Sequence, residues 1–445
     1  MSASLSAPRG LANERDPFWM PFTPMRGFRQ DPLLFASAEG VHYVTPDGRR
    51  VLDGMAGLWC VNAGHGQPRI VDAIRAAAGT LDFVSSFKMS HPAAQIYARR
   101  LCDFAPDGID HVFFVNSGSE AVDTALKIAR GYHHARGQGG RTKLIGRAKG
   151  YHGMGFGGLS VSGIGRHKAA FGPLLPETAH LPLPYERDTM AFSLAQPTGG
   201  EGASAALEAL LQIHDPATVA AVIVEPVTGS GGVYPPPQGY LERLRAICDR
   251  HGILLIFDEV ITGFGRLGTP FASQFYGVTP DLITCAKGMT NGSVPMGGVL
   301  LSGAVHDAFM AGPPEAIELL HGYTYSAHPL ACAAGMATLD VFADQDILAR
   351  ATEAFPHWQA AAFALRDQPL VTDIRVAGWL CAIDLKPRAG ADGQRGALCA
   401  RLCLEAGLLL RNVGDTLILS PPLVMEPDTI SYMFDTIAKT IARID

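Results

Sequence analysis

Short apolar runs alternate with amphipathic stretches between about residue 61 and residue 328. Strand-length runs with few polar positions occur at 111–115, 220–224, 253–257, 282–286 and 298–301. The segments 121–132 and 239–250, which follow two of these runs, have the spacing of amphipathic helices. Strands that are buried on both faces have continuous apolar sequences, and helices between strands make the connections parallel. The pattern therefore predicts an α/β domain with a central, mostly parallel sheet.

The residues on either side of this region have different patterns. Residues 1–60 mix aromatic residues with prolines, and a β-like piece at 41–44 precedes the turn Thr45-Pro46-Asp47-Gly48, which predicts an arm and a small hairpin. After Pro329 the pattern predicts helices and then strands, at 330–344, 346–366, near 371–385 and near 408–419. We expect an N-terminal arm and small-domain segment at 1–60, a large domain at 61–328 and a smaller α+β domain at 329–445.

Composition and charge narrow the class of protein. The chain has 445 residues, of which 47% are hydrophobic and 18% charged, and its net charge is −6. These values are typical of a soluble protein of two or three domains, and they exclude the basic surface that nucleic acid requires. No stretch reaches the ~20 apolar residues of a membrane-spanning helix. Residues 1–13 contain one arginine and no long apolar core, so we expect no secretory signal and a cytoplasmic location.

The cysteines are predicted to be buried free thiols. Several lie inside apolar runs, and no two of them form a Cys-x-x-Cys pair, which disfavours zinc sites and disulfides. They are Cys60, Cys102, Cys248, Cys285, Cys332, Cys381, Cys399 and Cys403.

Three polar features each follow a predicted strand, where an α/β fold builds its ligand site. The first is the run Asn116-Ser117-Gly118-Ser119-Glu120-Ala121, which opens the predicted helix. Free backbone N–H groups, small residues and a hydroxyl at the start of a helix suit a phosphate. Because Ser-Gly-Ser is also a common helix cap, this feature alone leaves both interpretations open.

The second feature is a pair of acids, Asp258 and Glu259, at the end of the apolar run 253–257. A carboxylate at the buried end of a strand is costly unless a cation or a hydrogen-bond donor meets it. A pyridinium nitrogen would be such a partner, because an ionised Asp258 would keep that ring protonated and able to accept electrons. A metal-binding or helix-capping acid is the alternative.

The third feature is Lys287, which directly follows the run 282–286 and lies 29 residues after Asp258 (287 − 258). Such a lysine is poorly explained as a surface charge. Burial lowers the pKa of a lysine and makes it nucleophilic, as a Schiff-base lysine must be. A lone Lys-Gly after a strand is often structural, but the three features together favour a pyridoxal phosphate site.

In their order along the chain these residues resemble the class III aminotransferases, which are fold-type I pyridoxal-phosphate enzymes. The shared motifs are Asn116-Ser117-Gly118-Ser119-Glu120-Ala121, Tyr151-His152-Gly153, Glu225-Pro226, Asp258-Glu259-Val260-Ile261-Thr262-Gly263-Phe264-Gly265-Arg266 and Lys287-Gly288. The resemblance covers the chain from about Trp19 to its end, and the block that begins at Asp258 is its most specific part. It implies an α/β large domain with a mostly parallel sheet and a smaller α+β domain built from both termini.

The resemblance implies a role for each matching position. Lys287 would form the Schiff base with pyridoxal 5'-phosphate and then move the proton between the substrate carbon and the cofactor. Asp258 would pair with the pyridine nitrogen, Val260 would pack beneath the ring and Tyr151 would stack on its other face; Val260 and Tyr151 would otherwise be ordinary core residues. The other cofactor-binding positions would be Ser117, Gly118, Ser119, His152 and Glu225, with Glu225 as a further acid near the site.

Thr324 looks like the residue that in this family reaches the phosphate of the neighbouring subunit. The resemblance therefore implies a homodimer with shared active sites, and it leaves open whether two dimers form a tetramer. From the residues alone, the loop around Thr324 is a polar segment before a helix and a plausible cap.

Two local features bear on the substrate. Phe22 and Trp59, with Trp19 near Phe22, place aromatic residues where the resembling enzymes line their substrate pocket, although such residues also pack in arms and hairpins. Arg411 stands where ω-amino acid:pyruvate aminotransferases carry a mobile carboxylate-binding arginine, and a guanidinium grips a carboxylate at two points. A surface ion pair is the alternative for Arg411.

The resemblance implies transamination from an ω-amino acid of the β-alanine type, or from a primary amine, to pyruvate, which becomes alanine. The enzyme would alternate between pyridoxal and pyridoxamine phosphate in two half reactions, with no nucleic acid or membrane partner. The alternative is a class III enzyme with another donor or acceptor, such as taurine, a polyamine or 2-oxoglutarate; an aminomutase of the same fold would need no external keto acid. A dehydrogenase would require a Gly-x-Gly-x-x-Gly turn after its first strand, which is missing, and a non-catalytic protein would not require both Lys287 and Asp258.

Overall fold

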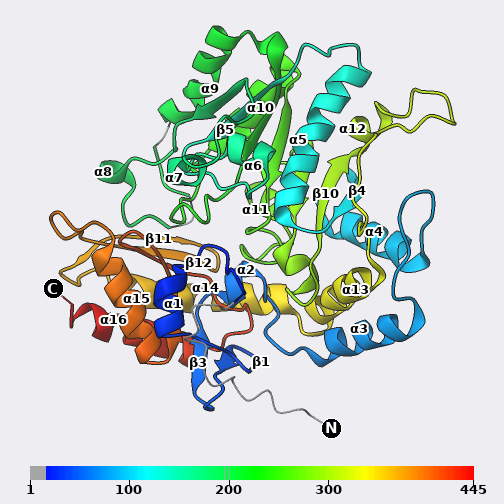
Figure 1. Ribbon diagram of the computed structural model, residues 1–445. Coiled ribbons are helices and arrows are strands. Elements are labelled where there is room, and N and C mark those ends of the chain that lie inside the picture. Colours follow the sequence, from blue (N-terminus) through cyan, green and yellow to red (C-terminus); the bar gives the residue numbers. More distant parts are fainter. Residues whose placement is uncertain (1–16, 195, 200, 445) are drawn as a thin grey trace.

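The computed structural model describes residues 17–194, 196–199 and 201–444. The middle of the chain forms the upper part of the molecule in Figure 1, and the first and last segments lie together in the lower part. Residues 1–13, for which we expect no secretory signal, lie outside the described residues.

The upper part is built on a seven-stranded sheet. Its strands are β4 (Ile109–Val115), β5 (Lys143–Arg147), β6 (Thr178–Leu181), β7 (Val219–Val224), β8 (Leu254–Asp258), β9 (Leu282–Cys285) and β10 (Gly297–Ser302). They lie in the order β4-β10-β9-β8-β7-β5-β6. Only β10 runs against its neighbours in the described sheet, and the other pairs are parallel. The predicted mostly parallel sheet is confirmed.

Helices cover both faces of this sheet because successive residues of a strand point to opposite sides. On β7, Ile223 packs with the apolar side chains of α5 (Gly118–Ala135). Its neighbour Val222 packs with those of α9 (Glu201–His214) and α10 (Tyr240–His251). Every residue of β7 is buried, which explains its uninterrupted apolar sequence.

Two four-stranded sheets form the lower part of the molecule. Their strands are β1 (Ser37–Glu39), β2 (His42–Val44), β3 (Arg50–Asp53) and β13 (Leu408–Leu409) in one, and β11 (Val371–Ala377), β12 (Leu380–Leu385), β15 (Thr416–Leu419) and β14 (Arg411–Val413) in the other. In the first sheet β13 pairs in parallel with β3, with Leu408 opposite Leu52. One small sheet thus contains strands from both ends of the chain, as the family resemblance implies; the domain bounds at residues 60 and 328 stay a prediction.

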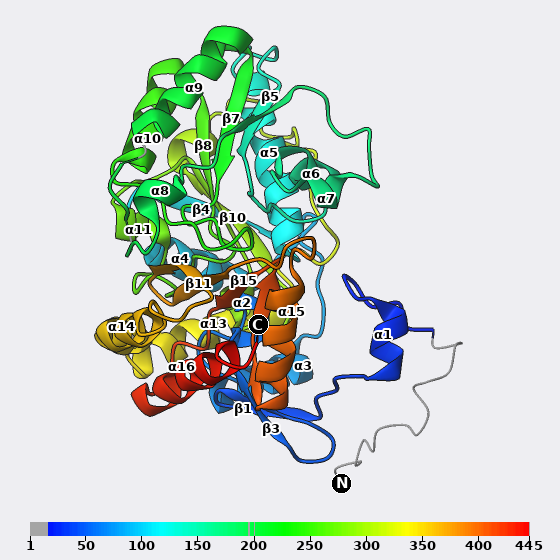
Figure 2. The same cartoon turned by 90° about the vertical axis from the view of Figure 1, so that its left-hand side faces the viewer.

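The remaining helices surround these sheets. The longer ones are α3 (Pro68–Thr80), α4 (Pro92–Phe104), α13 (Pro329–Asp344), α14 (Ile347–Phe363), α15 (Gln394–Glu405) and α16 (Pro427–Ile441). The shorter ones are α1 (Met25–Gln30), α2 (Ala56–Trp59), α6 (Phe156–Val161), α7 (Gly165–Lys168), α8 (Arg187–Met190), α11 (Ala272–Tyr276) and α12 (Gly303–Asp307), with 3-10 turns at Pro216–Thr218 (η1) and Lys287–Thr290 (η2). Figure 2 shows α1 standing apart from the rest of the molecule.

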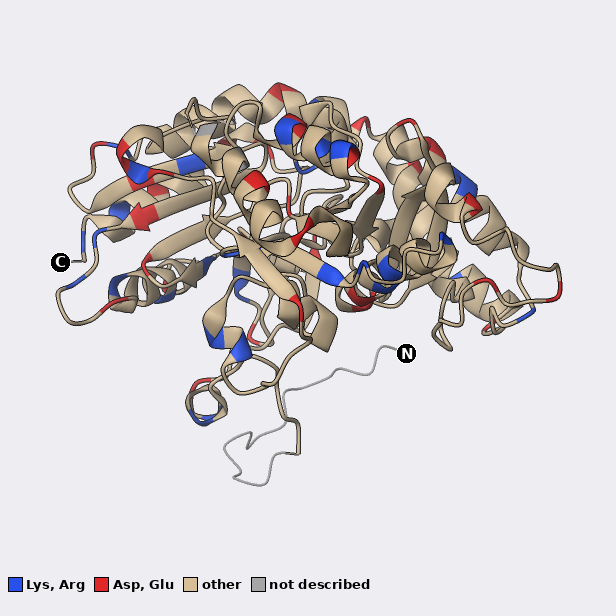
Figure 3. Ribbon diagram, turned by 90° about the horizontal axis from the view of Figure 1, so that it is seen from above, with Lys and Arg blue, Asp and Glu red and all other residues tan. Residues whose placement is uncertain are grey.

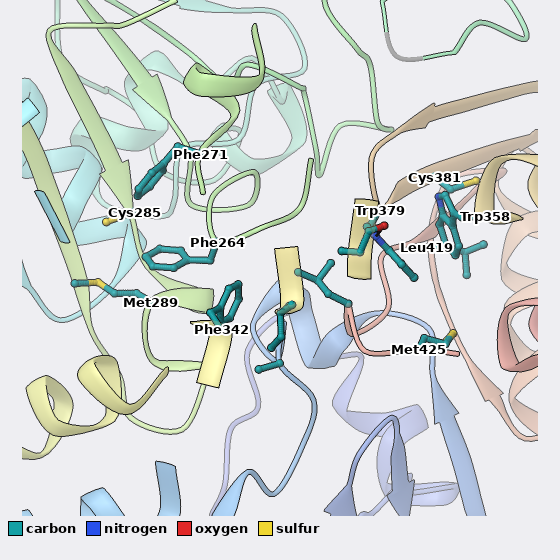
Figure 4. Close-up of a cluster of buried hydrophobic side chains, with 14 of the residues drawn as sticks. Phe264, Phe271, Cys285, Met289, Phe342, Trp358, Trp379, Cys381, Leu419 and Met425 are labelled. Carbon is teal, nitrogen blue, oxygen red and sulfur yellow. Dashed lines mark hydrogen bonds between the residues drawn. The ribbon is translucent and has the colours of Figure 1, made fainter. Parts of the chain in front are cut away.

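A continuous apolar cluster joins the upper and lower parts. In Figure 4, Phe264, Phe271 and Met289 extend from the large sheet toward Phe342 of α13. Farther along the same cluster, the indole of Trp358 in α14 stacks on Trp379 at 5.3 Å between ring centroids. This packing fixes the lower part against the carboxyl ends of the large sheet's strands.

The distribution of charged residues on the surface and the state of the cysteines agree with what the composition predicts. Figure 3 shows acidic and basic residues interspersed over the elements. All eight cysteines are free thiols, and only Cys60 and Cys102 are partly exposed. None of the helices in the described ranges is both long and apolar enough to span a bilayer.

Candidate active site

Residues from five neighbouring segments meet in one small cavity where the parallel strands end. The cavity has a volume of about 120 Å³. It is lined by Ser117, Gly118, Ser119, Tyr151, His152, Gly153, Glu225, Asp258, Val260, Ile261 and Lys287. The structure therefore brings together nearly all the predicted cofactor-binding residues, because the carboxyl ends of parallel strands share one edge of the sheet.

The turn between β4 and α5 forms one end of the cavity. The Ser117 hydroxyl accepts a hydrogen bond from the Glu120 N–H at 3.2 Å, so Ser117 is the helix cap that its sequence allows. Gly118 begins the helix at a point of close packing, since a Cβ there would lie 2.8 Å from a methyl of Val260. The turn presents the first N–H groups of α5 toward the cavity, which suits an anionic group.

Asp258 is buried at the end of β8 and is held by three donors. Its Oδ2 lies 2.8 Å from Nδ1 of His152, and its Oδ1 accepts hydrogen bonds from the Thr284 hydroxyl at 3.0 Å and from a backbone N–H. These contacts fix the orientation of the carboxylate on the cavity wall. The sequence interpretation did not include Thr284, whose only signal is a hydroxyl inside the apolar strand 282–286.

The second acid of the pair has a different role. Glu259 accepts hydrogen bonds from the N–H groups of Ala272 and Ser273, at the start of α11, and from the Thr262 hydroxyl. It is fully buried and does not line the cavity. The helix-capping alternative weighed for the two acids thus applies to Glu259, while Asp258 lines the cavity.

Glu259 should make the protein less stable as pH rises. Burial raises the pKa of its carboxyl to about 7, above the ordinary value of 4.5. The native state then holds the proton more tightly than the unfolded chain does. The resulting contribution to the free energy of unfolding, about 3 kcal/mol, is fully present below pH 4.5 and is lost as pH rises to about 7. In Glu259→Gln, thermal midpoints measured from pH 5 to 8 should lack this decline. The surface variant Glu208→Gln should keep it, and equal slopes in wild type and Glu259→Gln would contradict the assignment.

Lys287 follows β9 directly and faces the same cavity. Its backbone φ is 48°, a region that non-glycine residues seldom occupy, and the residue is partly buried at the cavity wall. Burial lowers the pKa of its amine, against the opposing effects of Cys60 and Asp258. A less basic amine is a better nucleophile and proton carrier near neutral pH.

Glu225 holds the loop that carries Tyr151. Its two carboxylate oxygens accept hydrogen bonds from the Tyr151 N–H at 2.9 Å and the Gly229 N–H at 2.8 Å. Burial raises the pKa of Glu225, although the nearby His152 opposes the change. The residue lines the cavity and at the same time positions the aromatic ring above it.

Trp59 and Arg411 lie beside Lys287, although they are 352 residues apart (411 − 59). The Lys287 amine is 6.0 Å from the Trp59 ring centroid, and the Arg411 guanidinium carbon lies 5.2 Å from the same centroid. Trp59 is buried. Arg411 forms no ion pair with any described residue, so the surface ion pair considered from the sequence is not its environment.

Two other predicted residues lie outside the cavity lining. Phe22 is 72% exposed and packs against His167, at 5.6 Å between ring centroids, and His167 in turn packs against Tyr151 at 5.7 Å. The sequence interpretation did not include His167. Thr324 is exposed on the loop before α13, so within one chain it does not contribute to the site.

The chemistry of the cavity wall fits pyridoxal phosphate. N–H groups and hydroxyls for an anion lie at the start of α5, a buried carboxylate lies at the end of β8, and a partly buried amine follows β9. The turn at Gly153 also needs a residue without a side chain, because a Cβ there would lie 2.5 Å from the Ser119 hydroxyl. The buried Nε2 of His152 has no hydrogen-bond partner, which leaves a polar atom for a ligand.

Comparisons with known proteins agree with this site. Residues 26–441 match the family described as aminotransferase class-III. The chain is 52% identical to an omega-aminotransferase of Caulobacter vibrioides over 98% of this chain and 99% of that protein. It is 44% identical to a beta-alanine–pyruvate aminotransferase of Pseudomonas aeruginosa, over 96% and 95% of the two chains.

A solved structure has the same fold. An amine transaminase from an uncultivated Pseudomonas species, determined in its PLP-bound form, superposes with a TM-score of 0.89 at 35% identity, covering 96% of this chain and 99% of that one. The predicted fold-type I architecture is thereby confirmed. The chain belongs to the class III aminotransferases and is a pyridoxal-phosphate-dependent transaminase of the omega type.

Proposed function

We propose that this enzyme transfers an amino group from an ω-amino acid of the β-alanine type, or from a primary amine, to pyruvate, giving alanine. The observation that carries the proposal is the position of Arg411. Its guanidinium carbon lies 5.2 Å from the centroid of the buried Trp59 ring, which the Lys287 amine also approaches at 6.0 Å, and no carboxylate of the described chain pairs with Arg411. One cation beside an aromatic wall suits a substrate with one carboxylate, such as pyruvate or β-alanine.

The names of the relatives support this substrate class. A beta-alanine–pyruvate enzyme, an omega-amino acid–pyruvate enzyme of Pseudomonas putida and a putrescine–pyruvate enzyme of Pseudomonas aeruginosa are 44%, 41% and 37% identical to this chain. All three act with pyruvate, whereas their donors differ. The names of the relatives therefore support pyruvate as the amino acceptor more strongly than they support any one amino donor.

The cavity residues would divide the work between holding the cofactor and moving a proton. Bound there, pyridoxal phosphate supplies a ring that accepts electrons and so weakens a C–H bond of the bound substrate. The turn at Ser117, Gly118 and Ser119 would hold the phosphate, and Asp258, oriented by its donors, would keep the ring nitrogen protonated. His152 would support that carboxylate at 2.8 Å.

Lys287 would carry the proton. Its amine would first hold the cofactor covalently and, once released, would take the proton from the substrate carbon and return it one position away. The lowered pKa of this amine favours its neutral form, which can accept the proton. Val260 and Tyr151, on the cavity wall, would hold the ring between them, and Glu225 fixes the backbone of Tyr151.

A homodimer with shared sites would complete the phosphate end. Thr324 is exposed and does not line the cavity of its own chain, which suits contact with a neighbouring subunit. The free, mostly buried thiols suit the reducing cytoplasm, where we place the enzyme. In a Thr324→Ala variant, weaker cofactor retention with an unchanged subunit count by light scattering would support this contact.

Alanine formation from pyruvate tests the proposed reaction. Purified enzyme with added pyridoxal phosphate should make alanine with β-alanine or one enantiomer of 1-phenylethylamine, when taurine, putrescine and glutamate are compared as donors. If pyruvate fails with every donor while an amine bleaches the yellow cofactor, the acceptor is wrong. Alanine formed only with glutamate, whose amino group is on the α-carbon, would overturn the donor.

Arg411→Ala should separate charged from uncharged substrates. Loss of a charge-assisted contact worth about 2 kcal/mol should raise KM for pyruvate and β-alanine about 30-fold. KM for 1-phenylethylamine in its half reaction should change less than threefold, because that donor has no carboxylate. The matched control is Arg401→Ala, an exposed arginine on α15 paired with Glu405. Equal changes for both donors would show that Arg411 acts on packing alone.

A further inference from the structure

Two histidines and an aspartate meet at the end of β4 that lies away from the active site. His111 belongs to β4, and His306 and Asp307 belong to α12. Each offers one ligand atom, and all these atoms lie within 4.8 Å of one another. Across the described ranges, this is the one place where at least three histidine, cysteine or acidic side chains are grouped in this way.

The backbone holds the two elements of this cluster in fixed positions. His111 is paired with Leu301 in the ladder between β4 and β10, and α12 begins directly after β10. The Ser302 hydroxyl caps α12, and the carboxylate of Asp110 accepts a hydrogen bond from the Gly303 N–H at 3.2 Å. The ligand atoms are therefore brought together by the sheet edge before any ion binds, which reduces the ordering cost of binding.

The side chains have the chemistry of metal ligands. The rings of His111 and His306 stack at 3.7 Å with an angle of 11° between their planes. An imidazole nitrogen has a lone pair that binds transition metals, and each of these two rings offers one such nitrogen to the cluster. The Asp307 carboxylate lies 3.1 Å from His306 Nδ1 and is 77% exposed, so it can turn toward a shared ion.

The surroundings favour a cation. Both histidines border an open cavity of about 1010 Å³. The acidic residues Asp103, Asp107, Asp110 and Glu318 also line it, against the single arginine Arg99. This excess of carboxylates gives the cavity a negative potential, and the cavity leaves room for the water molecules that complete a coordination shell.

We propose that His111, His306 and Asp307 form a binding site for a divalent transition-metal ion of the Zn²⁺ or Cu²⁺ class. Two imidazole nitrogens and one carboxylate oxygen suit these ions, whereas Mg²⁺ and Ca²⁺ prefer oxygen ligands alone. Ligands of a tetrahedral ion lie about 3.3 Å apart. Because the two rings are stacked nearly parallel, at least one of them must rotate out of the stack to direct its nitrogen at a shared ion. The ion would tie α12 to β4, the strand that leads to the phosphate-binding turn, and would stiffen that edge of the sheet.

Metal titration of the untagged holoenzyme tests the site. Calorimetry with Zn²⁺ should show one ion per chain with a micromolar Kd that is at least tenfold weaker at pH 6 than at pH 8, because the imidazoles must be deprotonated. Substoichiometric Cu²⁺ should give an electron paramagnetic resonance spectrum with coupling to two nitrogens. Tenfold excess Mg²⁺ should not displace either ion.

Matched variants locate the ion. His306→Gln should weaken Zn²⁺ binding at least tenfold and remove the coupling to one nitrogen, and Asp307→Asn should weaken it several-fold. Cys102→Ser, which removes a thiol on the same cavity, and His357→Gln, an exposed histidine bonded to Ser431, should bind as wild type does. Cofactor absorbance and the metal-free thermal midpoint show that each variant is folded.

Three results would overturn the proposal. They are a Kd in the millimolar range for wild type, unchanged binding in His306→Gln, and loss of binding in Cys102→Ser. If His306→Gln does not fold, the exposed Asp307→Asn variant and the two-nitrogen spectrum of wild type decide the matter.

Discussion

Replacing Lys287 with alanine lowers the rate of transamination by a factor on the order of 10⁴, the upper range for a lost proton-transfer group. The expected loss is large because Lys287 is the one amine that lines the cavity, and burial lowers its pKa. Borohydride treatment of wild type should fix the cofactor to the peptide that contains Lys287, and the variant should show no such adduct.

A matched control distinguishes chemistry from folding. Lys168 is also a partly buried lysine with a lowered pKa, but it bonds to Ser160 and His180 outside the cavity, so Lys168→Ala should keep nearly full activity. Added methylamine should partly restore the half reaction of Lys287→Ala, because a free amine can carry the proton. Full activity together with a borohydride-reducible adduct in Lys287→Ala would refute the assignment.

Asp258→Asn should reduce the rate of the half reaction about 10³-fold while the protein stays folded. Removing one partner of a buried charge pair costs about 4 kcal/mol, and the neutral amide no longer keeps the ring nitrogen protonated. The amide can still accept from the Thr284 hydroxyl, so the loss should appear in kcat rather than in the thermal midpoint. Stopped-flow measurement of cofactor bleaching by the amine gives this rate directly.

The surface acid Asp249 supplies the control for this variant. Asp249 pairs with Arg245 on α10, and its side chain is 62% exposed, so Asp249→Asn should match wild type. If Asp258 were only a structural cap, Asp258→Asn would lower the thermal midpoint and leave the bleaching rate unchanged.

The strands that carry the site could be predicted because they are buried on both faces along their whole length. β7 and β8 are buried along their whole length, so their sequences are continuous apolar runs that end where the sheet ends. The direction of a strand is not encoded in such a run, so the antiparallel β10 could not be distinguished from its neighbours. β5 contains Lys143, Gly146 and Arg147 within five residues, and its buried charges hide it from a search for apolar segments.

The site residues could be predicted where a motif directly follows the end of a predicted strand. Lys287 and Asp258 each follow an apolar run directly, and the structure places both on one cavity. The contacts that orient them are not visible in the sequence, because the Thr284 hydroxyl and the packing of His167 on Tyr151 depend on how separate segments meet. The different roles of Asp258 and Glu259 could not be predicted either. Glu259 caps α11, and the position of that helix next to Glu259 is specified only by the folded chain.

The parallel pairing of β13 with β3 has a consequence for the order in which the enzyme is made. Leu409 lies opposite Asp53, which precedes the turn to Trp59, and Arg411 follows two residues later. The strand that completes this sheet therefore leaves the ribosome after nine tenths of the chain has been synthesised. A nascent chain can therefore assemble the cofactor-binding residues first, and we expect it to add the substrate-binding Arg411 only near release. Truncated products would then bind the cofactor without selecting a substrate.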